Sequence, residues 1–422
     1  MLLTDSFLSF LLRIEDRVTN NIWPRARCCL LDYLSVYMGG NRCIGLMTDI
    51  LPPLRRGMAS HVLELDDGHR RGAVHVGATV FSALMAVAER ENLSNLDFLL
   101  GAIVGYEATI RLACAVQPGN KLRGYHATGT CGTVGAALGI AAALHYTKEQ
   151  MNTTLAAAVT SAAGVLEMQE DDSNLKPYNV GRAAMDAVAA AYIGRSGLKG
   201  PKDALGGKRG FLKVMTDEPH LEYLTDFSSD SLCIEQIYQK VYAACRHAHP
   251  AIAAALTLRD KVVIDDIDEI VVEAYRLAVA GHDHTDVSGI SSAKMSIPFS
   301  VAVALVKGNA GLTAFTEETI NNEMIIKLAK KVRVIENEEL TMLCPDKRAS
   351  ILTITTNNDS FSNRVDYPKG EPENPLSQQE LENKFRELAM YGGLTESDCD
   401  EVIHEVWKED FDLHKILNLV CK

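Results

Sequence analysis

The first two thirds of the chain carry apolar residues at helical spacing, with alanine filling many of the inner positions. Gly39 and Gly40 are expected to end the first of these helices, as glycine does at many helix C-termini. Ser94 is expected to cap the start of another helix, with Asp97 three residues later. The pattern predicts helices over residues 20–37, 80–91, 95–114, 128–145, 148–168 and 180–194.

The helix predicted over residues 128–145 has an unusual composition, because it contains Gly129, Gly132, Gly135 and Gly139 among alanines. Glycine destabilises a helix interior by about 1 kcal/mol relative to alanine. Four such residues therefore indicate a close approach of another backbone or of a ligand.

The pattern changes after about residue 255, where alternating and β-branched runs predict strands over residues 265–278, 331–335 and 349–356. Helices are expected between them, over residues 300–307 and 316–331. A Pro- and Gly-rich stretch over 367–375 predicts a boundary, and a charged helical segment follows from Ser377. We therefore expect a mainly α fold with a helical domain (1–255), a smaller α+β domain (256–374), and C-terminal helices (375–422) that complete the first domain.

The composition is that of an ordinary globular protein, with 422 residues, 47% hydrophobic and 23% charged. A net charge of −13 argues against nucleic acid and against an anionic membrane surface as partners. No apolar run is expected to reach a membrane span of roughly 18–20 residues without interruption. The first residues, MLLTDSFLSFLLRIED, do not resemble a signal peptide, and the ten cysteines include no Cys-x-x-Cys pair. We therefore expect reduced thiols and a cytoplasmic location.

Polar residues that could carry chemistry gather in four segments of the chain. Residues 64–77 hold three carboxylates, two histidines, two arginines and three glycines, directly before a predicted helix. The other segments each combine cations or histidines with a helix start; they are residues 124–130, 174–182 and 240–250. Carboxylates that orient, imidazoles that exchange protons and N–H groups at helix starts together indicate a site that binds an anion and moves a proton.

The first segment also has structural interpretations. Asp66 and Asp67 are ordinary cap residues, so the segment could be a polar loop that caps the next helix. Its carboxylates with His69 and His75 could hold a metal, although their spacing matches no standard metal pattern.

The other candidates have similar alternatives. His126 could be a satisfied interior histidine, and Lys176 a solvated lysine. Cys245 could be a nucleophile beside His247 or His249, or a small buried thiol. The combination of proton carriers with cations in all four segments favours the functional interpretation over these separate ones.

The order and spacing of several motifs resemble the MmgE/PrpD family, which includes 2-methylcitrate dehydratase, cis-aconitate decarboxylase and iminodisuccinate epimerase. The motifs are CLLDYLSVYMGG, MASHVLELDDGHRRGAVHVG, HATGTCGTVGAALG, LKPYNVGRAAMDAVAAAYIGRSGLKGPKDALGGKRGF, CRHAHPAI and SSAKMSIPFSVA. The resemblance implies a large helical domain with an inserted α+β lid, a homodimer and chemistry without a cofactor or metal. The segment between Gly40 and Ala59 is shorter than the resemblance implies.

The resemblance also implies which residues form the site. Glu64 matches a family position that is Asp in several members, and His75 matches the histidine of a His-Pro-Gly motif in which Val76 here replaces proline. His126 and Lys176 match a histidine before the glycine-rich helix and the lysine of a Lys-Pro motif.

Two further positions match the fourth segment. Lys240 matches a family lysine ahead of the Cys-Arg segment. Cys245 stands where the decarboxylase has a histidine, a departure that argues against decarboxylation.

The expected activity is therefore proton abstraction next to a carboxylate of a small di- or tricarboxylate, most simply by a hydro-lyase similar to 2-methylcitrate dehydratase. We predict His75, His126, Glu64 and Lys176 as catalytic residues, and Lys240, Arg182, Arg246 and Cys245 as substrate-binding residues. Epimerisation and decarboxylation remain alternatives. Two other classes of protein also remain possible. One is a relative that binds a polycarboxylate without turnover, which is suggested by the departures from the family motifs at Glu64, Val76 and Cys245. The other is an interaction protein that keeps only the helical scaffold.

Overall fold

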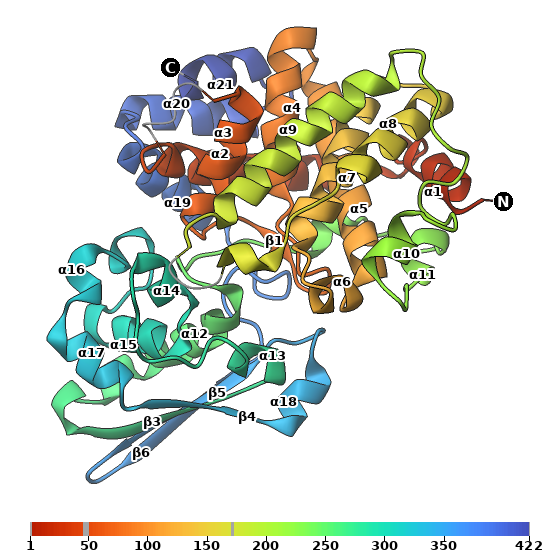
Figure 1. The fold of residues 1–422 in the computed structure, drawn as a ribbon. Helices are drawn as coiled ribbons and strands as arrows, with labels where there is room; N and C mark the ends of the chain where they lie inside the picture. Colours follow the sequence, from red (N-terminus) through yellow and green to blue (C-terminus); the bar gives the residue numbers. More distant parts are fainter. Residues whose placement is uncertain (1, 45–49, 170–172, 422) are drawn as a thin grey trace. The chain divides into compact units, whose positions relative to one another are not determined.

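The computed structural model describes residues 2–44, 50–169 and 173–421, and this part of the chain divides into two compact units. Unit 1 comprises described residues 2–169, 175–238 and 377–421, and unit 2 comprises 173–174 and 239–376. The α-helices of unit 1 are α1 (Leu3–Leu11), α2 (Ile22–Asn41), α3 (Pro52–Val62), α4 (Gly77–Glu91), α5 (Asn95–Val116), α6 (Gly119–Leu122), α7 (Ala127–Ala143), α8 (Lys148–Ser161), α9 (Lys176–Gly194), α10 (Phe211–Met215), α11 (Glu222–Thr225), α19 (Gln378–Tyr391), α20 (Glu396–Trp407) and α21 (Leu413–Val420) (Figure 1).

The glycine-rich helix α7 lies at the centre of unit 1, where it packs against α5 and α9 (Figure 1). A Cβ atom at Gly135 would lie 1.9 Å from Thr109 Oγ1 on α5, and one at Gly139 would lie 2.5 Å from the Gly101 carbonyl oxygen. Of the two reasons predicted for the glycines, close approach of a neighbouring helix is therefore the one that accounts for these positions.

The central helix α5 corrects one expectation from the sequence. Its 22 residues are long and apolar enough to cross a membrane by length and composition. Its apolar window is entirely buried inside the protein, as in the core helix of a globular fold. Ser94 caps it as predicted, because its side chain accepts a hydrogen bond from the Asp97 N–H.

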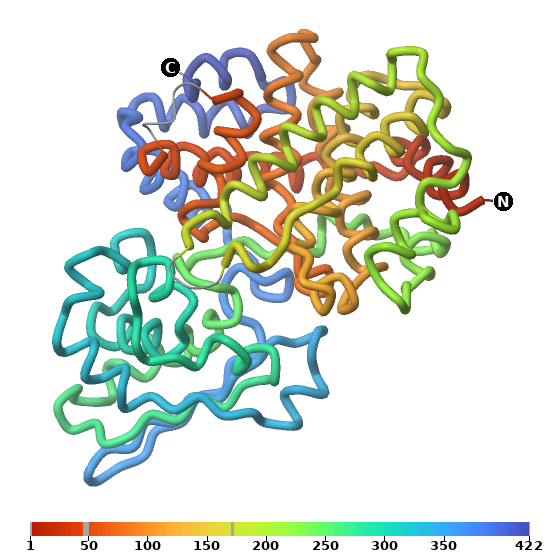
Figure 2. Tube along the Cα trace, in the orientation of Figure 1, coloured from red at the N-terminus to blue at the C-terminus, as the bar shows by residue number. Residues whose placement is uncertain are grey.

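The C-terminal helices pack on the N-terminal ones within unit 1. Helix α19 lies against α2, and α20 contacts both of them (Figure 2). The Lys384 ammonium of α19 donates to Asp32 Oδ1 (2.7 Å), which joins the two ends of the chain through a buried ion pair. Ser377 caps α19 with a capping box.

Among the predicted helices of unit 1, the boundaries of α2, α8 and α9 differ most from the expected ones. Helix α2 continues through Gly39 and Gly40 to Asn41, because these glycines face α3, where a Cβ at Gly40 would lie 1.9 Å from the Ala59 carbonyl oxygen. Helix α8 ends at Ser161, so residues 162–169 follow it without α-helix. Helix α9 begins earlier than predicted, with Pro177 in its first turn, where proline is well tolerated.

Unit 2 is built on a four-stranded sheet with the order β4-β3-β5-β6, in which only β3 and β4 run parallel. Helices α12 and α15 pack on this sheet (Figure 1). The strands are β3 (Ile267–Ala274), β4 (Val332–Glu336), β5 (Ser350–Thr356) and β6 (Ser360–Val365), and the α-helices are α12 (His249–Leu258), α13 (Arg276–Val279), α14 (Ile290–Met295), α15 (Ile297–Lys307), α16 (Glu317–Ile320), α17 (Glu323–Ala329) and α18 (Glu338–Leu343).

The sequence pattern missed β6 and placed the start of this unit too late. Strand β6 has no fully buried position, so its sequence lacks the apolar alternation that marks the other strands. The division falls between residues 238 and 239 rather than at 255, because α12 packs against β5 and β6. A second, two-stranded sheet in unit 1 pairs β1 (Gly68–His69) with β2 (Ile237–Tyr238).

Candidate active site

The candidate site begins where α3 ends in unit 1. His61 lies in the last turn of α3, and the chain then turns through Glu64, whose φ of 58° is in the left-handed region. Non-glycine residues seldom adopt this conformation, and those that do cluster at functional sites. The turn brings Asp66 back against His61.

Asp66 lies between two imidazoles. Its Oδ2 atom is 2.7 Å from His61 Nδ1 and 3.2 Å from His75 Nδ1. The His75 Nδ1 atom is also 2.9 Å from the Asp67 carbonyl oxygen. Because a carbonyl only accepts, His75 carries its proton on Nδ1. The two rings meet edge to face, with centroids 4.7 Å apart.

The charge of Asp66 depends on these imidazoles. Burial by itself raises the pKa of the Asp66 carboxyl, but His61 and His75 outweigh burial and hold this pKa well below its usual range. Asp66 is therefore ionised at neutral pH. A carboxylate in this position stabilises positive charge on either imidazole, as a group that passes a proton requires.

Glu64 links this pair of imidazoles to the lysine predicted from the Lys-Pro motif. Glu64 Oε1 forms an ion pair with the Lys176 ammonium and lies 3.8 Å from His61 Nε2. Lys176 is the first residue of α9, and both charged side chains are mostly buried. Glu64 thus contacts both a lysine and an imidazole.

His126 completes the cluster from the residue that precedes α7. Its backbone N–H donates to the Gly164 carbonyl (3.0 Å), and its ring centroid lies 6.5 Å from that of His61. Within the described part of the chain, its Nδ1 atom is buried without a hydrogen-bond partner. Burial, then the positive charges of Lys176 and the other imidazoles, lower the pKa of His126 well below its usual value. His126 is therefore a neutral imidazole with an available nitrogen, which suits a general base.

Asp67 has the structural role that the capping interpretation assigns to this loop. Its Oδ1 atom accepts from the Gly77 N–H (2.8 Å) at the start of α4, and its Oδ2 atom accepts from the Tyr106 hydroxyl (2.5 Å). Burial, with the nearby charge of Asp32, raises the pKa of Asp67 to about 6. The polar segment therefore contains both a helix cap and part of the cluster around Asp66.

The C-terminal helix α19 supports the same loop. Lys384 Nζ donates to the Leu65 carbonyl (2.8 Å) as well as to Asp32. Leu65 lies between Glu64 and Asp66, so this bond fixes the backbone that positions both carboxylates. The C-terminal segment thus contributes directly to the geometry of the site.

Comparison with known proteins identifies the family of this chain. Residues 54–224 match the MmgE/PrpD N-terminal domain, and residues 242–409 match the MmgE/PrpD C-terminal domain. The chain belongs to the MmgE/PrpD family.

Among the curated members similar to this MmgE/PrpD protein are several cis-aconitate decarboxylases. The enzyme of Aspergillus terreus is 26% identical over 356 residues, which cover 77% of this chain and 71% of the relative. The enzyme of Homo sapiens is 26% identical over 344 residues, covering 78% and 70%, and that of Mus musculus is 25% identical over 345 residues, covering 78% and 70%. This MmgE/PrpD protein is therefore similar to lyases.

Three residues predicted for substrate binding, Lys240, Cys245 and Arg246, belong to unit 2. Lys240 is almost fully buried, with 1% of its surface exposed. Arg246 forms a buried ion pair with Glu371 of the same unit. That these residues meet the cluster of unit 1 stays a prediction.

Arg182, also predicted for substrate binding, has several partners in unit 1. Its guanidinium donates to the backbone carbonyls of Ser161, Gly129 and Ala163 and to the Asp186 carboxylate. These bonds join α7, α8 and α9 and account for Arg182 as a structural residue. We therefore do not assign it a role in the proposed mechanism.

His61 was not among the predicted site residues, although it stands within the motif MASHVLELDDGHRRGAVHVG. Its i,i+3 spacing from Glu64, across the end of α3, was the available signal. Asp66 was weighed only as a cap residue or a metal ligand. Its role between two imidazoles depends on the turn at Glu64, and no local pattern predicts that turn.

Two groups of side chains have the types and spacing to hold a metal ion among the described residues. One is His61, Asp66 and His75, and the other is Cys245, His247 and His282 in unit 2. His69, which entered the predicted metal set, lies apart from the first group, with its Nδ1 atom accepting from the Gly72 N–H (3.1 Å).

A cavity of about 710 Å³ opens elsewhere in unit 1, between α1, the start of α8 and the loop after α9. Its lining includes Asp5, Lys148 and Lys199 and none of the predicted catalytic residues. This cavity is therefore separate from the cluster of His61, Glu64, Asp66, His75, His126 and Lys176.

Proposed function

We propose that this protein is a cofactor-independent lyase that acts on a small di- or tricarboxylate by moving a proton at a carbon next to a carboxylate. The observation that carries the proposal is the setting of His126, a buried neutral imidazole with an unpartnered nitrogen beside charged groups. Lys176, Glu64 and the imidazoles backed by Asp66 supply those charges.

The residues have complementary roles in this proposal. His126 is the base, because it stays neutral at pH 7, and His75 is the acid, because Asp66 stabilises its protonated form. Lys176 binds a substrate carboxylate and offsets the negative charge that develops on it. Glu64 and His61 position Lys176 and Asp66. Lys240 of unit 2 is proposed to contact a remaining carboxylate, as is Cys245 in the metal-free protein.

The first candidate reaction is decarboxylation of an unsaturated tricarboxylate such as cis-aconitate, which the names of the similar proteins support. The C–C bond to the carboxylate on the saturated carbon breaks and CO₂ leaves. The electron pair forms a new C=C bond, the former double bond shifts its pair to the carbon next to another carboxylate, and His75 protonates that carbon. The products are CO₂ and an unsaturated dicarboxylate.

The second candidate is dehydration of a hydroxy tricarboxylate similar to 2-methylcitrate, which Cys245 favours because it replaces a histidine of the decarboxylase. His126 removes the proton next to a carboxylate, and the electron pair forms the C=C bond as the hydroxyl leaves. His75 protonates the hydroxyl, so the products are water and an unsaturated acid. Epimerisation would use the same first step and return the proton to the opposite face.

Product analysis separates these reactions. The purified protein is incubated with cis-aconitate and with hydroxy tricarboxylates, and CO₂ and the remaining acids are measured. The proposal expects one of these substrates to be consumed, with His145→Ala, a surface histidine change, retaining the wild-type rate. Binding of these acids without turnover of any of them would contradict the proposal and support a catalytically inactive relative.

We also propose that the protein is a homodimer and that unit 2 acts as a lid over the cluster. Light scattering tests the first statement, since it expects twice the mass of one chain. Labels on the two units, measured by distance-sensitive fluorescence with and without a bound tricarboxylate, test the second. A monomeric mass or an unchanged distance would contradict the respective statement.

A further inference from the structure

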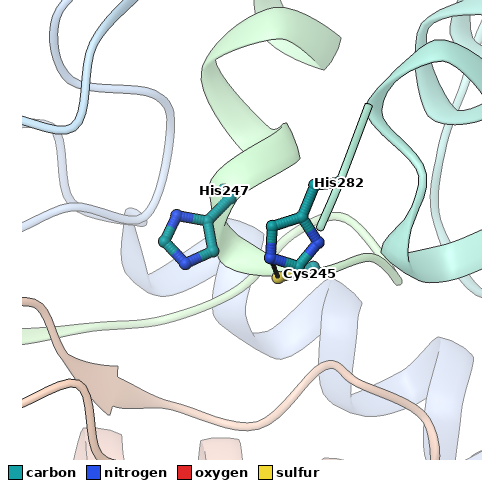
Figure 3. Close-up of side chains that lie close together, drawn as sticks. All are labelled: Cys245, His247 and His282. Carbon is teal, nitrogen blue, oxygen red and sulfur yellow. Dashed lines mark hydrogen bonds between the residues drawn. The ribbon is translucent and has the colours of Figure 1, made fainter. Parts of the chain in front are cut away.

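Three potential metal ligands converge within unit 2. Cys245 precedes η4 (Arg246–Ala248), a single 3₁₀ turn before α12, and His247 lies within this turn. His282 lies in the loop after α13. Figure 3 shows the two rings side by side, with the Cys245 sulfur beneath the ring of His282. One ligand atom of each residue lies within 4.8 Å of the other two, and the ring centroids are 4.9 Å apart.

The hydrogen bonds of the two histidines point toward ligation. His282 Nδ1 is 2.9 Å from the Met295 carbonyl oxygen, so this nitrogen carries the proton and Nε2 has the lone pair. That Nε2 atom lies 4.0 Å from Cys245 Sγ. His247 Nδ1 bonds the Tyr275 hydroxyl at 2.5 Å, which lets its Nε2 atom ligate as well. Metal-binding histidines commonly use their second nitrogen in this way.

The backbone holds these residues in place before any ion arrives. The Cys245 N–H donates to the Lys294 carbonyl (2.8 Å), and the Cys245 carbonyl accepts from the Ala248 N–H (2.9 Å). The His282 carbonyl accepts from the Ile297 N–H (2.8 Å). Ligands that are fixed in advance lose little freedom on binding.

We propose that Cys245, His247 and His282 bind Zn²⁺. One thiolate and two imidazoles are the ligand types that zinc prefers, and three protein ligands leave a fourth position for water or a carboxylate. Tetrahedral bonds of the usual lengths place sulfur and nitrogen ligands roughly 3.6 Å apart. Cys245 Sγ and His282 Nε2 are 4.0 Å apart, and the three ligand atoms lie within 4.8 Å of one another, so binding requires the side chains to move together by roughly 1 Å.

Two buried arginines, Arg246 and Arg348, lie near Tyr275 behind His247, so a cation can bind only where their charges are compensated. The nearest arginine in sequence, Arg246, is neutralised by Glu371 in a buried ion pair. Binding replaces the thiol proton of Cys245, so one proton is released for each zinc ion that binds to the thiol form.

The direct test is metal binding by the full chain, measured without any substrate. Protein stripped with a chelator is titrated with Zn²⁺, and with Co²⁺ as a spectroscopic probe. The proposal expects one zinc ion per chain and a thiolate-to-cobalt charge-transfer band. Cys245→Ser should lose the band, and His282→Ala should weaken Zn²⁺ binding at least 100-fold.

Two further variants separate this site from the rest of the molecule. His284→Ala changes a histidine of the same loop whose Nε2 atom faces the Ser292 carbonyl oxygen (3.2 Å), and it should bind zinc as the wild type does. Tyr275→Phe removes only the hydroxyl behind His247 and should weaken binding roughly 10–100-fold. Circular dichroism checks the fold of each variant.

Two results would overturn the proposal: no stoichiometric zinc in the wild type, or the same zinc affinity in folded Cys245→Ser. The second result would place the ion elsewhere, for example at His61, Asp66 and His75. Because the readout is metal content rather than turnover, a negative result here leaves the proposed lyase activity to its own test.

Discussion

The two units each place histidines side by side, but in different electrostatic surroundings. In unit 1, His61 and His75 share the ionised Asp66, and Lys176 and Glu64 add further charges. In unit 2, the Nδ1 atoms of His247 and His282 contact a hydroxyl and a carbonyl, both neutral groups. The thiol of Cys245 takes the place that a carboxylate has in unit 1.

This difference shows that the neighbours of an imidazole decide its chemistry. A carboxylate stabilises the protonated ring and so favours proton transfer. A neutral acceptor fixes one tautomer of the imidazole, and the other ring nitrogen then has a lone pair that can bind a metal. A nearby thiol provides a further metal ligand once it is deprotonated. We therefore propose proton chemistry for the cluster of unit 1 and metal ligation for the cluster of unit 2.

The largest expected effect comes from the proton-transfer residues. His126→Ala and Lys176→Ala should each lower kcat/KM by about 10²–10⁴-fold, the usual contribution of general acid–base catalysis. His145→Ala, which removes an exposed imidazole paired with Asp97, is the matched control and should leave the rate unchanged. Steady-state kinetics on the true substrate provide the measurement. Near wild-type rates in both site variants would break the assignment.

A smaller loss should follow when the carboxylate between the imidazoles becomes an amide. Asp66→Asn keeps the size of the side chain but removes its charge, so we expect kcat to fall about 10²-fold while KM changes little. Asp97→Asn changes the equivalent partner of the exposed His145 and should have no effect on turnover. A rise in KM without a change in kcat would instead show that Asp66 contributes to substrate binding.

Burial of neutral His126 should also make stability depend on pH. Its pKa is lower in the folded chain than the value of 6.5 expected when it is unfolded, so the unfolded chain binds more protons below that pH. The part of the free energy of unfolding that depends on neutral His126 is fully present above about pH 6.5 and is lost as the pH falls. Thermal unfolding at pH 7 and pH 5 should show a smaller decrease in Tm for His126→Gln than for the wild type. Equal decreases would contradict the neutral assignment.

Asp67 should act in the opposite direction, because its pKa is raised to about 6 in the folded chain. The contribution of Asp67 to the free energy of unfolding is present at low pH and is lost as the pH rises toward and through 6. Asp67→Asn keeps an oxygen for the Gly77 N–H and carries no charge, so Tm at pH 7 should rise by a few degrees, at roughly 2–4 °C per kcal/mol. An unchanged Tm at pH 7 would show that the charge of Asp67 is compensated in the fold.

The smallest effect should come from metal removal. Chelator-treated protein should keep its full rate, because the proton-transfer groups of unit 1 need no ion in the proposed mechanism. The assay is run before and after dialysis against a chelator, with the metal content measured in parallel. If the chelator abolished activity and Zn²⁺ restored it, the reaction would depend on a metal ion, and the proposed mechanism would be wrong.

Local patterns in the sequence predicted much of the fold. The helices around α5, α7 and α9 were found because apolar spacing and caps such as Ser94 act within a few residues. Helix ends set by tertiary contacts were missed. Gly39 and Gly40 belong to the interior of α2 because α3 packs against them, and only the folded chain shows this contact.

The candidate site was predicted in part for the same reason. Glu64, His75, His126 and Lys176 stand in dense polar segments, and the structure places them around one cluster in unit 1. His61 and Lys384 were missed, because one lies within a helix and the other comes from a segment far along the chain. Long-range contacts of this kind have no signature in a single sequence.

The most direct test of the account is deuterium incorporation into a carboxylic acid. The protein is incubated in D₂O with a panel of di- and tricarboxylates, and the recovered acids are analysed by mass spectrometry and NMR. The account predicts one deuterium at a carbon next to a carboxylate, retained with chelator-treated protein. The deuterium should be lost with His126→Ala if the acid is dehydrated or epimerised, and with His75→Ala if the acid is decarboxylated. Deuterium incorporation at the wild-type rate with both variants, or none with any acid of the panel, would contradict the account.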